Sequence, residues 1–572
     1  MNANLLIVVL LLVSVVPAAA KDARLGELRS LDSYHPFREY APDGASDAER
    51  REAWEKRAAQ IRLRVKVAAG IYPEPTRTPL EPVIHGRREM DGYTIEKVYF
   101  QSIPGHYVSG NLYRPTGPVP AGGRPAVLCP HGHWKGGRFL DEGGDARPGG
   151  KVANALAIGA ERFVAAARSP LQARCVQLAR MGCVVFHYDM LAYADSIQFP
   201  VHKSSPRAQL DSLREGQWGF ASPAAAARLQ SSFGLQTWNS VRALDFLLTL
   251  PEVDAKRVAV TGASGGGTQS MMLAAVDQRV AAAFPAVMPS SAMQGGCTCE
   301  NCYLLRIGQG NIDIVAAIAP RPLGITAADD WSIELESKGH PDLVDLYKLL
   351  GAPSNYEAHF NIHFKHNYNH VSRTQMYGFL NRHFKLGFEQ PVLESDFKYL
   401  GREDLTVWDE AHPPPSGPEI GDAHARSLCL WMTRDARRQV RALLEPVDGA
   451  ARSRAREVLG KAWGVMLGRP MPAAHEVESE MLDKQDRGDW LLMRGQVRNS
   501  SHGEEIAVVF CYPKNWAGKV ALWVHPQGST SLFGPAGPGG VEDTPRPEVR
   551  KLLDAGYAVV GADLFAQSEG AK

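Results

Sequence analysis

The chain has 572 residues, which exceeds one ordinary domain and predicts at least two. A hydrophobic content of 44% and a mean hydropathy of −0.22 are typical of a globular protein. The formal net charge of +1 offers no field that would attract a polyanion, so we expect no nucleic-acid partner.

The chain begins with the features of a secretory signal peptide. Residues 5–16 form an apolar run that Pro17 ends, and Ala18-Ala19-Ala20 before Lys21 offers a small-residue cleavage site. A membrane anchor is the alternative, but the run is short for a bilayer span. We therefore expect removal of residues 1–20, a secreted or periplasmic protein, and no stable membrane insertion after cleavage.

Residues 21–90 are predicted to be an N-terminal lead-in that contains one helix. Ser46 has the side chain of an N-cap, and Glu49 three residues later completes a capping box. The helix is expected to run to Ala69 and to end before the Pro-rich residues 71–78.

Residues 91–410 alternate short apolar runs with amphipathic segments. This alternation predicts an α/β domain with a mostly parallel sheet flanked by helices. Residues 191–236 fit no strand and are interpreted as an insertion near the site. The predicted strands are 93–100, 107–113, 126–129, 183–187, 258–261, 280–286, 322–326 and 355–360, and the predicted helices are 171–181, 237–250, 341–350 and 372–384.

The motif Gly262-Ala263-Ser264-Gly265-Gly266 lies between an apolar run, 257–261, and a predicted helix, 267–277. A serine inside G-x-S-x-G on a strand–turn–helix is typical of a nucleophile elbow. Small residues let strand and helix approach closely, and the turn lifts the Ser264 hydroxyl out of the sheet. Backbone N–H groups at the start of the helix then point toward a reacting carbonyl. We predict that Ser264 is a nucleophile rather than a surface serine in a Gly-rich turn.

A serine nucleophile needs a base and an acid that orients the base. In this architecture the acid and then the histidine follow the serine along the chain. Asp329 and Asp330 follow the predicted strand 322–326; either could serve, and we favour Asp330. His366 follows a strand-like run at its first turn and is the predicted base, with His363 and His370 as alternatives.

Two backbone N–H groups are predicted to form the oxyanion hole. Gly265, directly after the nucleophile, supplies one, and the loop His131-Gly132-His133 supplies the other through the His133 backbone. The side chains of His131 and His133 are expected to hold this loop. Trp134 and Trp331 are predicted to bind substrate by stacking on sugar rings, although tryptophan is more often a core residue.

The cysteine-rich segment Cys297, Cys299 and Cys302 raises the question of a metal site. Zinc needs a fourth ligand, and none stands nearby in the sequence. In an exported protein a local disulfide or a tied loop is the preferred interpretation. The histidines within 359–370 are assigned to a strand and to the base. We therefore expect no metal and no cofactor.

Residues 411–419 are rich in proline and are predicted to be a linker, with a second unit over residues 420–572. This unit repeats the spacing of the first. A strand separates Gly182 from Asp189 and Gly556 from Asp563, seven residues apart in both cases. We predict an incomplete α/β-hydrolase-like repeat that lacks an elbow. Because half a sheet leaves an unpaired edge, either the sequence is cut short or the unit docks on something else.

Residues 46–385 resemble a group of secreted bacterial α/β-hydrolases related to acetyl xylan esterases and dienelactone hydrolases. One departure is Ala192, where such proteins often carry glycine. The resemblance rests on Gly110-Asn111-Leu112-Tyr113-Arg114-Pro115, His131-Gly132-His133, Tyr188-Asp189-Met190, Gly262-Ala263-Ser264-Gly265-Gly266, Ala328-Asp329-Asp330-Trp331 and His366-Asn367-Tyr368-Asn369.

The resemblance implies an α/β-hydrolase fold and a serine esterase that acts on acyl esters, most of all acetyl esters, of a polysaccharide or a small molecule. A peptidase of the prolyl oligopeptidase kind would share the triad, but residues 21–90 are too short for its usual propeller. A non-catalytic carbohydrate-binding protein is the second alternative. The complete triad of the first unit argues against it there, whereas the second unit shows no elbow.

Overall fold

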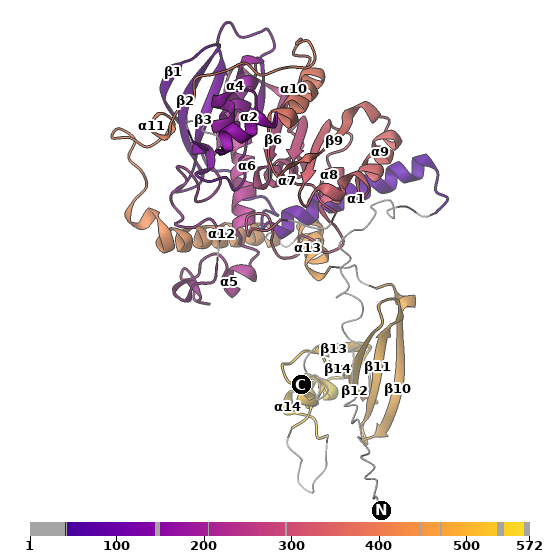
Figure 1. Cartoon of the computed structure of the whole chain (residues 1–572). Coiled ribbons are helices and arrows are strands. Elements are labelled where there is room, and N and C mark those ends of the chain that lie inside the picture. Colours follow the sequence, from indigo (N-terminus) through magenta and orange to yellow (C-terminus); the bar gives the residue numbers. More distant parts are fainter. Residues whose placement is uncertain are drawn as a thin grey trace, which may run out of the picture. The chain divides into compact units, whose positions relative to one another are not determined.

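The computed structural model describes residues 41, 43–143, 149–203, 205–291, 295–445, 448–468, 472–534 and 543–564. These residues form two compact units that divide near residue 470 (Figure 1). The expected signal peptide, residues 1–20, lies outside the described residues. None of the helices that the structure describes is long and apolar enough to cross a membrane.

The larger unit is built on a nine-stranded sheet with the order β1-β2-β3-β5-β4-β6-β7-β8-β9. The pairs from β1 to β5 in this order are antiparallel, and every pair from β5 to β9 is parallel. Together with helices on both faces, this topology confirms the predicted α/β-hydrolase fold. The strands are β1 Val83–Glu89, β2 Tyr93–Ile103, β3 His106–Pro115, β4 Arg124–Leu128, β5 Val184–Tyr188, β6 Val253–Ala263, β7 Ala282–Ala286, β8 Leu323–Asp329 and β9 Tyr356–Lys365.

Helices cover both faces of this sheet (Figure 1). One core lies between the sheet and helices α1, α6, α7, α8 and α9, and the other lies between the sheet and helices α4 and α10. The helices are α1 Asp47–Ala68, α2 Lys151–Ala157, α3 Val164–Arg168, α4 Pro170–Arg180, α5 Pro223–Ala226, α6 Ser232–Thr249, α7 Gly265–Val276, α8 Asn311–Ala316, α9 His340–Leu349, α10 His370–Phe384, α11 Arg402–Leu405, α12 Gly421–Leu444 and α13 Gly449–Leu467.

The central strands are apolar on both sides because each side faces a core. In β6, Val258 and Val260 pack into the first core, whereas Ala259 and Ala263 pack into the second. Successive side chains of a strand point to opposite faces, so such a strand needs a continuous apolar run. The run that made this segment recognisable as a strand is therefore the direct consequence of its central position.

Helix α1 has the N-terminus that the sequence predicts. The Ser46 side chain accepts the Glu49 N–H, and the Glu49 carboxylate accepts the Ser46 N–H at 2.8 Å, which completes the capping box. The helix then buries Trp54, Ile61 and Val65 in the first core. The lead-in is thus part of the larger unit rather than a separate arm.

The boundary between the units differs from the one expected at 411–419. Helix α12 follows the Pro-rich residues, and its Leu428 and Cys429 are buried in the first core of the larger unit. Its Asp435 accepts hydrogen bonds from the Thr76 N–H at 2.9 Å and the Thr76 hydroxyl at 2.7 Å. The second unit therefore begins near 470 rather than at 420, because the apolar face of α12 is buried against the first.

The smaller unit contains a five-stranded sheet with the order β10-β11-β12-β14-β13. Its first three pairs are antiparallel and its last pair is parallel, as in β1-β2-β3-β5-β4. This identity of order and direction confirms the partial repeat. The elements are β10 Val477–Asp486, β11 Trp490–Asn499, β12 Glu504–Pro513, β13 Lys519–Trp523, α14 Pro547–Asp554 and β14 Tyr557–Ala562.

A buried ionic network holds the loops of the larger unit together. The guanidinium of Arg138 is fully buried and donates to both carboxylate oxygens of Asp189, at 2.9 and 3.0 Å, and to Asp195 at 2.6 Å. It also donates to the carbonyl of Leu405 at 3.0 Å. Asp195 in turn accepts the Thr406 hydroxyl at 2.7 Å. One cation thus joins the loops after β4 and β5 to the segment that follows α11.

Arg138→Met is expected to lower the free energy of unfolding by about 3–5 kcal/mol, because it leaves two carboxylates buried without their cation. Denaturant unfolding of the two proteins measures the difference. Arg87→Met is the control, since the Arg87 and Glu89 side chains are 58% and 67% exposed and their ion pair contributes little. Equal losses in the two variants would contradict the assigned role of Arg138.

Candidate active site

The residues singled out in the sequence follow the carboxyl ends of four strands in the parallel half of the sheet. Ser264 follows β6, the loop 131–134 follows β4, Asp330 follows β8 and His366 follows β9. Strand β4 is the point from which the sheet grows in both directions, with β5 on one side and β6 on the other. Open α/β sheets bind ligands at such a switch point.

Ser264 occupies a strained turn between β6 and α7. Its φ of 58° and ψ of −128° lie outside the regions that most residues adopt. A Cβ on Gly262 would lie 2.6 Å from the carbonyl oxygens of Gly266 and Pro130, and one on Gly266 would lie 2.5 Å from the Pro130 oxygen. Only glycine allows the elbow to approach the loop after β4 so closely.

His366 and Asp330 form a hydrogen-bonded pair. The Nδ1 atom of His366 lies 2.6 Å from Oδ2 of Asp330, and the other carboxylate oxygen accepts the N–H of Ser332 at 2.7 Å and its hydroxyl at 2.5 Å. Burial raises the pKa of Asp330, but the hydrogen bonds from His366 and Ser332 outweigh it and hold this pKa below its usual value. An ionised Asp330 accepts the Nδ1–H and leaves Nε2 of His366 available as a base.

The alternative acid and bases have other surroundings. The Asp329 side chain is 40% exposed and forms an ion pair with Lys365. His363 is exposed, whereas His370 is buried with its Nδ1 atom 3.3 Å from Glu394. Among these candidates the structure joins only His366 and Asp330 to each other.

The loop after β4 lies directly over the serine. A Cβ on Gly132 would stand 3.3 Å from the Ser264 hydroxyl oxygen, and one on Gly265 would stand 3.0 Å from Cε1 of His133. The residues predicted to supply the oxyanion hole, Gly265 and His133, are therefore neighbours. Among the described residues no hydrogen bond joins the Ser264 hydroxyl to His366; such contacts commonly tighten only when substrate binds.

Both tryptophans predicted to bind substrate lie against the His366 ring. The Trp134 ring is stacked at a centroid distance of 5.7 Å, and the Trp331 ring is tilted at 4.3 Å. Both side chains are half-buried. They line the base with aromatic surface, which limits the orientations of the imidazole.

His131 fastens the loop after β4 to the loop after β5. Its Nδ1 atom lies 2.8 Å from the Gly132 carbonyl, and its Nε2 atom accepts the Met190 N–H at 3.1 Å. Burial lowers the pKa of His131 to about 3, so the ring is neutral.

Ala192 lies in the loop after β5 and has a φ of 58°, in the left-handed region that glycine favours. The presence of alanine at position 192, where related proteins often carry glycine, thus leaves the left-handed turn in place.

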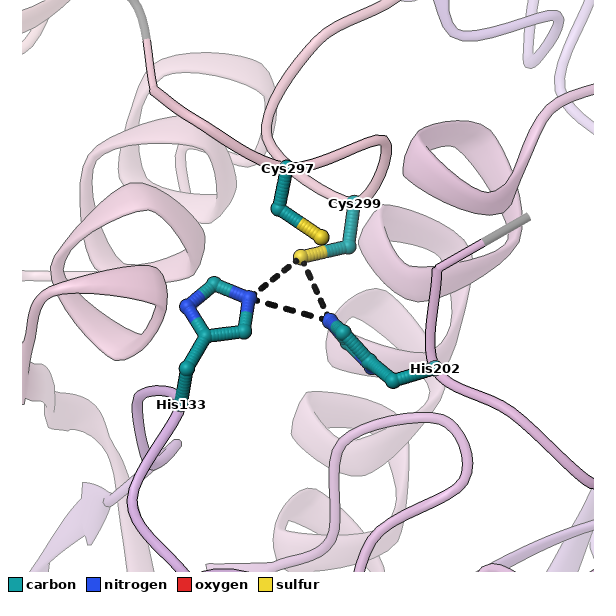
Figure 2. A group of neighbouring side chains, drawn as sticks. All are labelled: His133, His202, Cys297 and Cys299. Atoms are coloured by element: carbon teal, nitrogen blue, oxygen red, sulfur yellow. Dashed lines mark hydrogen bonds between the residues drawn. The ribbon is translucent and has the colours of Figure 1, made fainter. Parts of the chain in front are cut away.

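Sequence reasoning missed a contact between loops that are far apart in the chain. His133 meets His202, Cys297 and Cys299 (Figure 2). The His133 ring also lies next to Gly265 of the elbow. Residues 191–236 were expected to be an insertion, with no role assigned to His202. The expected local disulfide is also not formed, because Cys297, Cys299 and Cys302 are all free thiols. The spacing of residues within the cysteine segment cannot reveal that a residue from another loop, such as His202, contacts it.

A family model described as acetyl xylan esterase (AXE1) matches residues 237–291, which span most of α6, the elbow and β7. This match bears out the resemblance to acetyl xylan esterases for that segment. No curated protein matches the chain.

Several solved structures are similar to this chain. The methylesterase BT1017 is 23% identical, covering 71% of this chain and 77% of its own, with a TM-score of 0.47. An acetyl xylan esterase from Paenibacillus sp. R4 is 17% identical, covering 60% and 98%, with a TM-score of 0.35. A glucuronoyl esterase from Solibacter usitatus is also 17% identical, covering 62% and 99%, with a TM-score of 0.38.

Gly266→Ala is expected to lower the free energy of unfolding by about 3 kcal/mol, because the added methyl group meets a backbone oxygen that cannot move alone. Denaturant unfolding followed by circular dichroism checks this. Gly464→Ala, in α13 with open space around it, is the matched helical control and should be neutral or raise stability by up to about 1 kcal/mol. A neutral Gly266→Ala would refute the close packing at the elbow.

Proposed function

We propose that the protein is a secreted or periplasmic serine esterase that hydrolyses acyl esters on carbohydrate, with acetyl as the acyl group. The observation that carries the proposal is the combination of a strained Ser264 elbow with the His366–Asp330 pair at the same edge of the sheet. A structural serine would not need a strained turn in which Gly262 and Gly266 have no space for a Cβ.

The proposed reaction proceeds through an acyl-enzyme. Nε2 of His366 takes the proton of Ser264 while the serine oxygen attacks the ester carbonyl, and Asp330 stabilises the imidazolium. The backbone N–H groups of Gly265 and His133 hold the oxyanion. His366 then returns the proton to the leaving alcohol oxygen. Water, deprotonated by His366, attacks the acyl-enzyme carbonyl. The bond to the Ser264 oxygen then breaks, His366 returns the proton to that oxygen, and the acid is released.

Three observations support a carbohydrate ester as the substrate. The segment that carries the elbow matches the acetyl xylan esterase family model. The rings of Trp134 and Trp331 flank His366, where a sugar attached to the reacting ester would lie, and aromatic faces are suited to the apolar face of a sugar ring. The protein's near-neutral charge fits a neutral polysaccharide rather than a polyanion.

Ser264→Ala is expected to lower kcat by about 10⁶-fold, because no other group can form the acyl-enzyme. Acetate released from acetylated xylan, together with hydrolysis of p-nitrophenyl acetate, measures the loss. Ser453→Ala, an exposed serine of α13, is the control and should keep full activity. If Ser264→Ala keeps a tenth of wild-type activity, the nucleophile is assigned wrongly. If the wild type cleaves p-nitrophenyl acetate but not acetylated xylan, the proposal of a polysaccharide substrate is refuted.

Asp330→Asn is expected to lower kcat by about 10⁴-fold, since an amide no longer fixes the tautomer of His366 or stabilises its charged form. Asp329→Asn provides a control one residue away, and it should change kcat less than about threefold because Asp329 pairs with Lys365. Steady-state kinetics on p-nitrophenyl acetate compares the two. A larger loss in Asp329→Asn would reverse the assignment of the acid.

A further inference from the structure

Four side chains from three separate loops converge beside the elbow (Figure 2). His133 comes from the loop after β4, His202 from the insertion after β5, and Cys297 and Cys299 from the loop after β7. Each side chain offers one ligand atom, and these four atoms all lie within 4.8 Å of one another.

The individual distances are those of ligands around a common centre. The two Nε2 atoms of His133 and His202 are 3.0 Å apart. The sulfur of Cys299 lies 3.3 Å from the first and 3.1 Å from the second. Metal–ligand bonds of about 2.0 Å to nitrogen and 2.3 Å to sulfur place the donors of a tetrahedral ion about 3.3 to 3.8 Å apart. The cluster needs only small shifts to reach that geometry.

The outer contacts of the two histidines leave both Nε2 atoms directed into the cluster. Nδ1 of His202 lies 2.6 Å from the Leu191 carbonyl, which can only accept, so this nitrogen carries a proton. Nδ1 of His133 faces the Glu300 carboxylate at 4.0 Å. A hydrogen bond between the two Nε2 atoms would satisfy that one contact, whereas a metal ion would bind both imidazoles and both sulfurs.

These outer contacts have the form found around metal-bound histidines. A ligating imidazole commonly donates its second N–H to a backbone carbonyl or a carboxylate, which fixes the tautomer and the ring orientation. The Leu191 carbonyl has this role for His202. The Glu300 carboxylate faces the corresponding Nδ1 atom of His133, at 4.0 Å. Glu300 is itself held by the Thr268 hydroxyl of α7, at 3.3 Å.

The surroundings favour a closed structural site. Cys297 and Cys299 are 5% and 0% exposed and pack with Met190, and the ring of Tyr193 lies edge-on to both histidines. Two imidazoles and two thiolates are a preferred zinc ligand set, and four protein ligands leave no open position for water or substrate.

We propose that His133, His202, Cys297 and Cys299 bind one structural Zn²⁺ ion, with release of the two thiol protons. This replaces the expectation that the chain binds no metal, and it does not depend on the proposed esterase activity. The cysteine segment supplies two of the four ligands, and the two histidines, neither of which is near this segment in the sequence, supply the other two.

The site has a consequence for the neighbouring loops. The ring of His133 covers Gly265, and the same residue belongs to the loop that passes over Ser264. A metal ion that holds this ring ties the loop after β4 to the insertion and to the cysteine segment. The ion is thus a positioning element for the loop that carries His133 and Trp134, rather than a participant in bond cleavage.

The test measures zinc in the full-length protein. Reduced protein is incubated with Zn²⁺, desalted and assayed by elemental analysis, and the wild type is expected to hold about one ion per chain. Cys299→Ser and His202→Gln should each lower the zinc content at least about fivefold. Cys302→Ser is the matched control, since this cysteine lies three residues beyond Cys299 and outside the cluster, and it should keep its zinc.

A second readout separates ligation from simple misfolding. Replacement by Co²⁺ should give the intense visible bands of a tetrahedral thiolate site in the wild type, in Cys302→Ser and in the inactive Ser264→Ala. Chelation should lower the melting temperature of these proteins, and added zinc should restore it. Cys299→Ser should show neither the bands nor the zinc-dependent shift.

Three results would overturn the proposal: no zinc bound by reduced wild type, equal zinc in the wild type and a Cys297→Ser/Cys299→Ser double variant, or an intact mass that reveals a disulfide between these cysteines after reconstitution. None of these results concerns ester cleavage. An active esterase without zinc refutes the metal site alone, whereas a zinc-bound protein without esterase activity refutes the proposed function alone.

Discussion

The larger unit depends on a backbone-to-backbone contact at the centre of its sheet. The Pro130 carbonyl lies so close to Gly262 and Gly266 that neither position has space for a Cβ. Because the loop after β4 and the start of α7 are pressed together, Ser264 is held in a conformation that few residues adopt. The position of the serine is therefore set by packing that involves no side chain of its own.

Around this contact buried polar groups join the loops to one another. Arg138 donates hydrogen bonds to both Asp189 and Asp195, and neutral His131 bridges the loops after β4 and β5. Buried polar groups are costly unless they are fully satisfied, so each alternative loop arrangement is penalised. These hydrogen bonds give a defined shape to the edge of the sheet that carries Ser264. Loss of any one of their partners would leave a buried polar group unsatisfied and destabilise that edge.

Features set by residues close together in the sequence could be predicted, whereas contacts between residues far apart in the sequence could not. The capping box at Ser46, the elbow at Ser264 and the repeated interval before Asp563 each lie within a short window, and the fold class follows from such windows. The Arg138–Asp195 contact joins residues 57 positions apart, and the His202–Cys299 contact joins residues 97 positions apart. No local pattern identifies such partners. The Pro-rich residues 411–419 were interpreted as a linker because the surface that buries α12 comes from elsewhere in the chain.

The smaller unit shows what part of the larger sheet forms a self-contained arrangement. Its five strands repeat the order and directions of β1 to β5 and enclose a core of their own, which includes Trp490, Leu492, Val549 and Val559. This arrangement already contains one parallel crossover, the one between the counterparts of β4 and β5. Ser264 follows β6, for which the sheet of the smaller unit has no counterpart among the described residues. The strand that carries the nucleophile thus belongs to the half of the larger sheet that the repeat leaves out.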